Sequence, residues 1–145
     1  MNKIKISSVF LFIFILLLGS LILLRLRNAE DFKQKIVLAH EVHKVLHYLM
    51  FDLRDAREST IQDVPADGQW HHRFAFENTQ QGPLEYLIKE GHLFRINAGQ
   101  RLLIADDIGD LQMRRQTQTP DILEVQIKAQ KGVSLVSNLK IRIRQ

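Results

Sequence analysis

The chain has 145 residues, enough for one domain and a short appendage, and apolar residues make up 46% of it. It contains no cysteine, which excludes disulfide bonds, thiolate catalysis and cysteine-based zinc sites. Four of the twenty basic residues precede position 28 and all sixteen acidic residues follow it, so residues 28–145 carry no net charge and give no support to a nucleic-acid-binding surface.

An apolar run opens the chain. From Val9 to Leu24 it is interrupted only by Gly19 and Ser20, and together with Ile4 and Ile6 it reaches the roughly 20 residues that a helix needs to cross a bilayer. Basic residues that could reach lipid headgroups flank the run on both sides, namely Lys3, Lys5, Arg25 and Arg27. We therefore predict a single-pass transmembrane anchor over residues 1–27.

A cleaved secretory signal peptide is the alternative for this segment. The apolar run exceeds the roughly 7–15 residues of a signal-peptide core, and Arg25, Leu26 and Arg27 stand where a small-residue cleavage site would follow. Lysine and arginine counts alone favour a cytoplasmic domain, whereas a very short N-terminal tail is also typical of anchors whose N-terminus is cytoplasmic. Composition leaves the topology open.

The helical pattern continues past the anchor over about residues 28–59, which contain no glycine and no proline. Apolar residues recur there at intervals of three and four and form a stripe along one helical face: Leu38, Val42, Val45, Leu46, Leu49 and Leu53. Pro65 and Gly68 lie just beyond, where helix-breaking residues are expected. We predict one amphipathic helix that packs on a sheet.

From Trp70 the apolar period changes from 3.6 to 2, which indicates strands with one buried face. The clearest alternating runs are 74–76, 84–88, 94–96, 123–127 and 139–143, with shorter candidates at 102–105 and 111–114. Turns are predicted at Glu90-Gly91, Ala98-Gly99-Gln100 and Ile108-Gly109-Asp110. The expected fold is α+β: a long N-terminal helix, transmembrane in its first half, packed on an antiparallel sheet of about six strands, with residues 28–145 as the domain and its sheet over about 70–145.

Three histidines are the most plausible metal ligands in the sequence. His40, His43 and His47 share one helical face, a spacing that can bind zinc or copper. That face lies away from the apolar stripe, and no acidic ligand completes the set, so a solvated polar face is the better interpretation and the metal site a weak candidate. His71-His72 and His92 are expected on loop or strand surfaces.

The other polar clusters carry no recognisable chemistry. Asp106, Asp107 and Asp110 lack the spacing of a calcium loop and are predicted to form a tight turn. The pairs Arg114-Arg115 and Arg142/Arg144 are predicted to be solvent-facing strand positions, with an acidic partner patch as the alternative. No phosphate-binding loop, nucleophile elbow or acid–base pair of carboxylates is present, so we predict neither a cofactor nor enzymatic activity.

The order of these elements resembles the type IV pilin-like superfamily, in particular the larger minor pseudopilins of type II secretion systems and related pilus and competence proteins. The segment VLHYLMFDLRDAR (45–57) is similar to the end of the long helix in those proteins. The run 84–114, with Leu-x-Tyr, Leu-Phe-Arg, RLLIA and Ile-x-x-Leu-x-Met-Arg, resembles their sheet region, which Pro120 to Val125 continues. Pilin-like precursors have a glycine immediately before the apolar helix, where the prepilin peptidase cleaves, and usually a glutamate five residues into the mature chain. Here no glycine precedes Gly19 and no acidic residue precedes Glu30, so peptidase processing and the assembly step that uses that glutamate are not carried over.

The resemblance implies a non-enzymatic inner-membrane subunit that primes or caps a short fibre, with its domain periplasmic or extracytoplasmic. Its partners would be membrane lipid and other pilin-like subunits, contacted through the N-terminal helices. The residues expected in helix–helix packing are Gly19, Ser20, Leu38, Val42, Leu46, Leu49 and Leu53. The alternative is a bitopic accessory or sensory protein whose domain binds a ligand or partner without polymerising.

Overall fold

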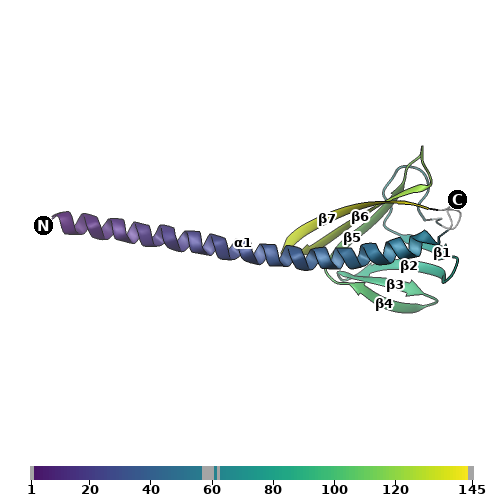
Figure 1. The fold of residues 1–145 in the computed structure, drawn as a ribbon, viewed down its shortest axis with the longest axis horizontal. Helices are drawn as coiled ribbons and strands as arrows, with labels where there is room; N and C mark the ends of the chain where they lie inside the picture. The colour runs from purple at the N-terminus through teal and green to yellow at the C-terminus, as the bar shows by residue number, and fades with distance from the viewer. Residues whose placement is uncertain (1, 57–60, 62, 144–145) are drawn as a thin grey trace. The chain divides into compact units, whose positions relative to one another are not determined.

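The computed structural model describes residues 2–56, 61 and 63–143, with the backbone alone for residues 2–12. By contacts the chain divides into two compact units, Met1–Gln34 and Lys35–Gln145, a boundary later than the one predicted after Arg27. Helix α1 (Asn2–Arg54) provides the described part of the first unit and the only α-helix among the described residues of the second (Figure 1).

In the first unit, the described helix is apolar on all sides from Ile13 to Leu24, apart from Ser20. Eleven leucine, isoleucine and phenylalanine side chains between Ile13 and Leu26 are 46–70% exposed. Among the described residues, no helix is both long and apolar enough to cross a membrane. The predicted anchor also takes in residues 1–12, whose side chains lie outside the described part of the chain.

Helix α1 ends at Arg54, so the predicted end near Ser59 is wrong at least for Asp55 and Ala56; residues 57–59 lie outside the described part. The reason is a long-range contact that sequence periodicity does not contain. Ala56 pairs with Asn78 as an isolated antiparallel bridge, and the Thr79 amide donates to the Asp55 carbonyl at 3.1 Å. The chain therefore pairs with the end of β1 directly after the helix ends.

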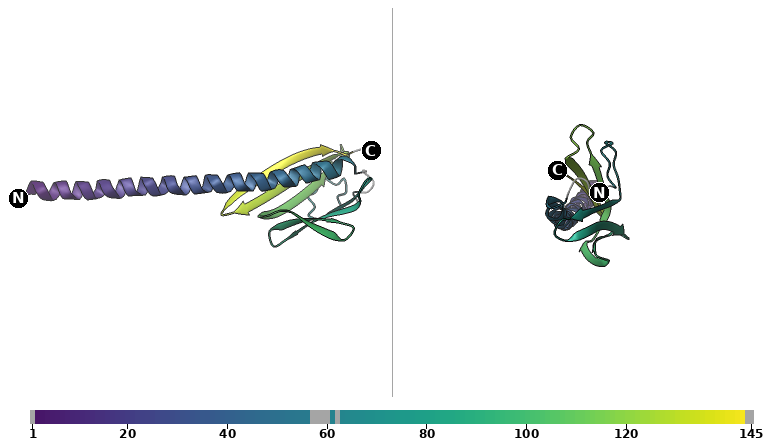
Figure 2. Two further views of the ribbon diagram at one scale, coloured as in Figure 1. Left: turned by 60° about the horizontal axis from the view of Figure 1, so that its bottom comes forward. Right: turned by 90° about the vertical axis from the view of Figure 1, so that its right-hand side faces the viewer.

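Two antiparallel sheets follow the helix, in place of the single predicted sheet. The first has the order β1-β2-β3-β4 and the second the order β5-β6-β7. The strands are β1 (Phe74–Asn78), β2 (Gly82–Lys89), β3 (His92–Asn97), β4 (Gln100–Ala105), β5 (Ile108–Arg115), β6 (Ile122–Lys131) and β7 (Val133–Arg142). Each of the seven alternating runs found in the sequence lies largely within one of these strands. Both sheets lie beside the C-terminal part of α1 (Figure 2).

Two of the three predicted turns are confirmed. Glu90 and Gly91 have φ values of 54° and 80°, and Ala98 and Gly99 have 48° and 80°, as a two-residue hairpin loop with two left-handed residues requires. The third prediction is wrong, because Gly109 lies inside β5 at a register irregularity opposite β6. The chain turns instead at Asp106 and Asp107, between β4 and β5.

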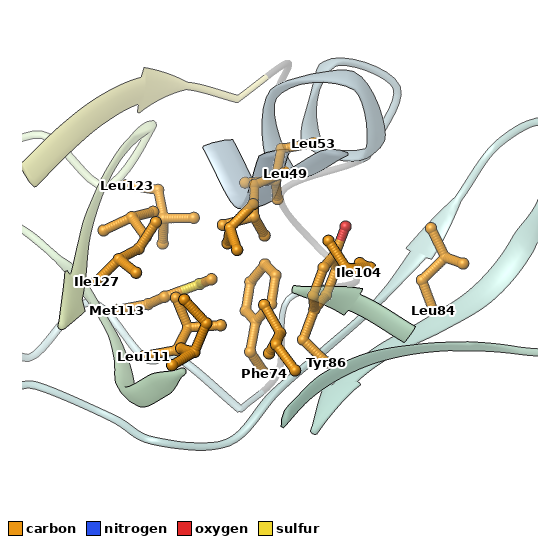
Figure 3. Close-up of a cluster of buried hydrophobic side chains, with 14 of the residues drawn as sticks. Leu49, Leu53, Phe74, Leu84, Tyr86, Ile104, Leu111, Met113, Leu123 and Ile127 are labelled. Carbon is orange, nitrogen blue, oxygen red and sulfur yellow. The ribbon is translucent and has the colours of Figure 1, made fainter. Parts of the chain in front are cut away.

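The core forms between the helix stripe and the inner faces of the two sheets. Leu49 and Leu53 face aromatic side chains of the first sheet and aliphatic ones of the second (Figure 3). The rings of Phe74 and Phe76 are 4.9 Å apart, and those of Phe74 and Tyr86 5.9 Å. From the second sheet, Met113, Leu123 and Ile127 complete the cluster. The prediction that the helix packs on antiparallel strands is therefore confirmed.

The same burial corrects the predicted role of the stripe in contacts between subunits. Leu38, Val42, Leu49 and Leu53 are at most 4% exposed, and Leu46 packs partly against the same core. Side chains enclosed by the domain's own sheets are not available to a partner helix. The stripe belongs to folding, and any contact with another subunit must use other residues.

Leu49 and Met50 allow a test of this assignment with neighbouring residues of one helix. We expect Leu49→Ala to lower the free energy of unfolding by about 2–5 kcal/mol, since it removes a fully enclosed side chain and leaves a cavity. Met50→Ala, at a position 54% exposed, should change it by no more than about 0.5 kcal/mol. Urea denaturation of the full chain in mild detergent measures both, and equal effects would contradict the assignment.

Candidate functional site

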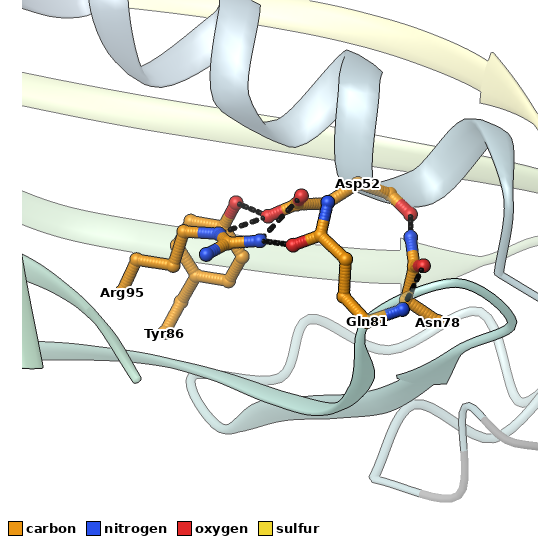
Figure 4. Close-up of polar contacts among 5 residues, drawn as sticks. All are labelled: Asp52, Asn78, Gln81, Tyr86 and Arg95. Carbon is orange, nitrogen blue, oxygen red and sulfur yellow. Dashed lines mark hydrogen bonds and ion pairs between the residues drawn. The ribbon is translucent and has the colours of Figure 1, made fainter. Parts of the chain in front are cut away.

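The most elaborate polar arrangement in the chain centres on Asp52, in the last turn of α1. Its carboxylate is 1% exposed and accepts three hydrogen bonds (Figure 4). Arg95 of β3 donates through Nε to Oδ2 at 2.6 Å and through Nη2 to Oδ1 at 2.9 Å, a two-point ion pair. The Tyr86 hydroxyl of β2 donates to Oδ2 at 2.5 Å. One side chain thus connects the helix to two strands.

A second layer of hydrogen bonds extends the Asp52 network to the end of the helix. Asn78 Nδ2 donates to the Asp52 carbonyl oxygen at 2.8 Å, which satisfies one of the free carbonyls at the helix C-terminus. The Asn78 side-chain oxygen accepts the amides of Gln80 and Gln81 at 2.9 and 3.0 Å, which holds the β1–β2 turn. The Gln81 side-chain oxygen in turn accepts from Arg95 Nη2.

Electrostatics explain why these partners are needed. A carboxylate near a helix C-terminus meets the negative end of the helix dipole, and burial removes its hydration. The two-point contact with Arg95 offsets both costs, and its hydrogen bonds with Asp52 raise the pKa of the Arg95 guanidinium. Burial, followed by the nearby Asp52 charge, raises the pKa of the Tyr86 hydroxyl far above its ordinary value, so this group stays protonated and donates.

The Asp52 network is closed, and its geometry is that of a structural connection. Every buried side-chain nitrogen and oxygen among the described residues has a hydrogen-bond partner, which leaves no group there waiting for a substrate. The sequence interpretation did not identify this site. The sequence does contain an indication of this site. Asp52 follows Leu49 by three residues, the spacing of the apolar stripe, so it lies beside the buried helix face, where a charge requires a partner.

The predicted histidine face is present on the helix. His40, His43 and His47 are exposed on the side of α1 away from the sheets, and the His47 ring is edge-on to Tyr48 at 6.4 Å. Among the described residues, no three histidine or acidic side chains gather closely enough to hold a metal ion. The other histidines each meet one carboxylate, in the pairs His71–Asp67, His72–Asp110 and His92–Asp106.

The three aspartates around the β4–β5 turn point to different partners. Asp106 contacts His92 at 2.6 Å, and Asp107 accepts from Lys131 at 3.0 Å. Asp110 accepts from Gln112 at 2.8 Å and lies 3.6 Å from Lys128. The prediction of a tight turn is confirmed for Asp106 and Asp107, whereas Asp110 belongs to β5.

The arginine pairs differ from the solvent-facing prediction at one position. Arg115 is buried, and its Nε donates to the Pro120 carbonyl at 2.9 Å, because alternate residues of β5 face the core. Arg114 faces outward, lies 4.6 Å from the Trp70 ring centre and donates to Glu124 at 2.6 Å. Arg142 is exposed beside Asp121, and Arg144 lies outside the described residues.

Glu124 organises the outer face of the second sheet. Lys140 lies 2.7 Å from its carboxylate and Arg114 2.6 Å, and Gln116 also donates to it. Hydrogen bonds from Lys140 and then Arg114 lower the pKa of Glu124. On the same face Gln126 donates to Asn138 at 3.1 Å. This face satisfies its own polar groups.

A second apolar set lies on α1, on the side away from the sheets. Ile36, Val37, Met50 and Phe51 are each about half exposed, and the three histidines lie between the two pairs. The predicted small-residue pair is also exposed: nothing lies within 4 Å of a Cβ built on Gly19, and the Ser20 hydroxyl donates to the Leu17 carbonyl at 2.8 Å. The sequence interpretation overlooked this second set because the buried stripe dominates the periodicity.

In comparisons with protein-family models, with curated proteins and with solved structures, the chain has no match.

Removing the charge of Asp52 should cost much of the stability of the domain. Asp52→Asn leaves the partly buried Arg95 guanidinium without its carboxylate, and we expect a loss of about 3–5 kcal/mol in the free energy of unfolding. Asp63→Asn, at an exposed position, should change it by no more than about 0.5 kcal/mol. Urea denaturation measures both, and a mild effect of Asp52→Asn would contradict the role assigned to the ion pair.

Because the pKa of Tyr86 is raised in the folded state, the free energy of unfolding should decrease as the pH rises into the alkaline range. The folded state keeps the proton, whereas the unfolded chain releases it above the ordinary tyrosine value of 10.0. This contribution is therefore complete below about pH 10 and declines above it, by up to about 1.4 kcal/mol per pH unit. Urea denaturation between about pH 10 and pH 11 should show a smaller decline for Tyr86→Phe than for the unchanged chain; parallel declines would contradict this linkage.

Proposed function

We propose that this protein is a non-enzymatic, membrane-anchored subunit of the minor pilin or pseudopilin type, which assembles with other pilin-like subunits at the tip of a short fibre of a type II secretion or type IV pilus-like system. The observation that carries the proposal is the separation of two apolar sets on one helix. One set is buried in the domain, and the other remains exposed after folding is complete.

The exposed set supports helix–helix contact between subunits. Ile36, Val37, Met50 and Phe51 form no part of the core, and their exposure costs free energy unless another surface covers them. A helix that presents two pairs of apolar side chains on the side away from its own domain fits a partner helix packed alongside. Gly19 and Ser20 would allow close approach of backbones in the preceding segment.

The apolar first part of the chain supports attachment to a membrane. The run from Val9 to Leu24 reaches spanning length together with Ile4 and Ile6, and the described residues of that run are exposed on every side of the helix. A helix that is apolar on all sides is stable only when lipid or protein surrounds it. We place the domain on the periplasmic side of the inner membrane.

The second candidate is a bitopic accessory or sensory protein whose domain binds a ligand or partner and does not polymerise. The apolar run contains no acidic residue, which favours it, since pilin-like proteins usually carry a glutamate near the start of that helix. A hollow of about 470 Å³ on the outer side of the first sheet, lined in part by Asp63, Glu77 and Glu85, is the place where such a ligand would bind.

Cysteine crosslinking in native membranes tests the proposal cleanly because the chain contains no cysteine. We expect Met50→Cys, on the exposed helix face and labelled with a thiol-attached photoreactive crosslinker, to crosslink on illumination with a pilin-like subunit that mass spectrometry identifies. Asn138→Cys is the matched control: it is also exposed, but it lies on the hydrogen-bonded outer face of the second sheet and should give little product.

The two candidate functions differ in the products of this experiment. Crosslinks from Met50→Cys to pilin-like chains, absent from Asn138→Cys, support the fibre subunit. Uncrosslinked protein from both variants, or crosslinks only to unrelated membrane proteins, would contradict it and favour the accessory protein. The intact mass of the native protein adds an independent readout, since removal of a short leader with methylation of the new terminus would establish pilin-type processing.

A further inference from the structure

The edges of the two sheets are not equally protected. An uncovered strand edge offers unpaired backbone groups to other chains, and proteins normally cover it or place charges along it. The edge of β5 is covered: His71 and Met113 exchange two backbone hydrogen bonds, of 2.7 and 2.9 Å, and the Gly68 amide donates to Arg115 at 3.0 Å. The edge of β1 pairs with Ala56 at Asn78.

The remaining two edges differ in their side chains. Strand β7 carries Lys140 and Arg142, whose side chains are exposed and charged, as expected for a protected edge. Strand β4 carries Leu102 and Leu103, 46% and 49% exposed. Among the described residues, no backbone group forms a hydrogen bond with Gln100–Ala105 along the edge that faces away from β3. The opening ends where the Asp106 amide donates to the Glu41 carboxylate at 2.9 Å.

The register places the two leucines on opposite faces of the first sheet. Leu102 pairs with Arg95, on the inner face, and Leu103 pairs with Phe94, on the outer face. Because Phe94 also pairs with Leu87, the outer face presents an apolar row that runs across three strands and ends at the open edge. The outer face of the second sheet carries one strongly exposed apolar side chain, Val136 (50% exposed), among polar side chains that pair with one another, and among its described residues it has no comparable apolar row.

Charge at the same edge indicates which segment would fit. Arg101 is exposed, faces outward beside Ile96 and forms no ion pair with any described residue. A hollow of about 440 Å³ at this end of β4 is lined by Arg95, Asn97, Ala98, Gln100, Arg101 and Leu102. Opposite charges on directly facing strand positions stabilise pairing. A segment next to β4 would therefore place an acidic side chain opposite Arg101.

We propose that β4 is a docking edge that accepts an antiparallel strand from a partner chain, with two apolar residues opposite Leu103 and Leu102 followed by an acidic residue opposite Arg101. The added strand satisfies the free backbone groups of β4, covers both leucines and extends the apolar row of the outer face. The inference deepens the proposed function, on which it rests for the existence of a partner subunit, and it names the kind of segment that this subunit contributes.

Two synthetic peptides test the proposed edge on the full chain in mild detergent. Both have the central sequence valine-valine-X between threonines, with glutamate as X in one and lysine in the other. We expect the glutamate peptide to slow amide hydrogen exchange across Gln100–Ala105 and to leave Val133–Arg142, the other open edge, unchanged. It should bind more tightly than the lysine peptide, by up to about fivefold from the favourable charge pair with Arg101 and by a further factor from the repulsion between lysine and Arg101.

Substitution of Arg101 makes the test specific. Arg101 is exposed, so Arg101→Glu should fold normally, with a thermal midpoint like that of the unchanged chain, and should reverse the preference between the peptides. Arg101→Gln should make the two peptides equal. The proposal would be overturned if these substitutions left the preference between the two peptides unchanged, if β7 were protected as much as β4, or if neither peptide protected β4.

Three further outcomes separate this inference from related ones. If raising the protein concentration alone protects Gln100–Ala105, the occupant is a second copy of the chain and the proposal of a partner strand is overturned. If neither peptide protects β4 while Met50→Cys still crosslinks to pilin-like subunits, the edge proposal fails and the proposed function stands. Peptide binding to β4 without such crosslinks would support the proposed docking edge and contradict the proposed function as a fibre subunit.

Discussion

The buried carboxylate of Asp52 is the constraint on which the rest of the domain depends. A charge at the end of a helix and inside a core is tolerated only with partners in fixed positions, and here they come from two strands: Tyr86 of β2 and Arg95 of β3. Asn78 of β1 adds a hydrogen bond to the main-chain carbonyl of Asp52. These contacts fix where the helix ends and how the first sheet meets it. The apolar stripe supplies most of the burial but is compatible with many rotations of the helix, and the polar contacts select one.

The domain therefore combines non-directional burial with a small number of directional bonds. Leu49 and Leu53 would pack against any apolar sheet face of suitable size, whereas the two-point contact between Asp52 and Arg95 exists in one register only. Because the chain contains no cysteine, no disulfide bond can connect the helix to the sheet, and the ion pair between Asp52 and Arg95 connects them instead. The protonated Tyr86 hydroxyl belongs to the same arrangement, because an ionised phenol would repel Asp52.

The sequence predicts what depends on local spacing and misses what depends on distant pairing. The helix stripe, the seven alternating runs and the Glu90-Gly91 and Ala98-Gly99 turns follow from periods and from glycine positions, and the structure confirms them. The helix end at Arg54 depends on Asn78, which lies far along the chain, and no local signal marks it. Gly109 has turn chemistry but lies at a strand irregularity, and the division into two sheets arises because β4 and β5 turn at Asp106 and Asp107 without pairing. Of the candidate site, the sequence located the histidine face but not Asp52, whose partners only the fold brings together.

Folding and assembly use different residues in the arrangement proposed for this protein. The stripe and the Asp52 network are enclosed, so substitutions there act on stability first and on any partner only as a consequence. The exposed helix set around Met50 and the β4 edge around Leu103 contribute little to the core, so substitutions there leave the fold intact. Apolar groups without a folding role are retained in water at a cost in solubility, which a contact with a partner would offset. A loss of assembly without a loss of stability therefore identifies these two surfaces, whereas a joint loss points back to the core.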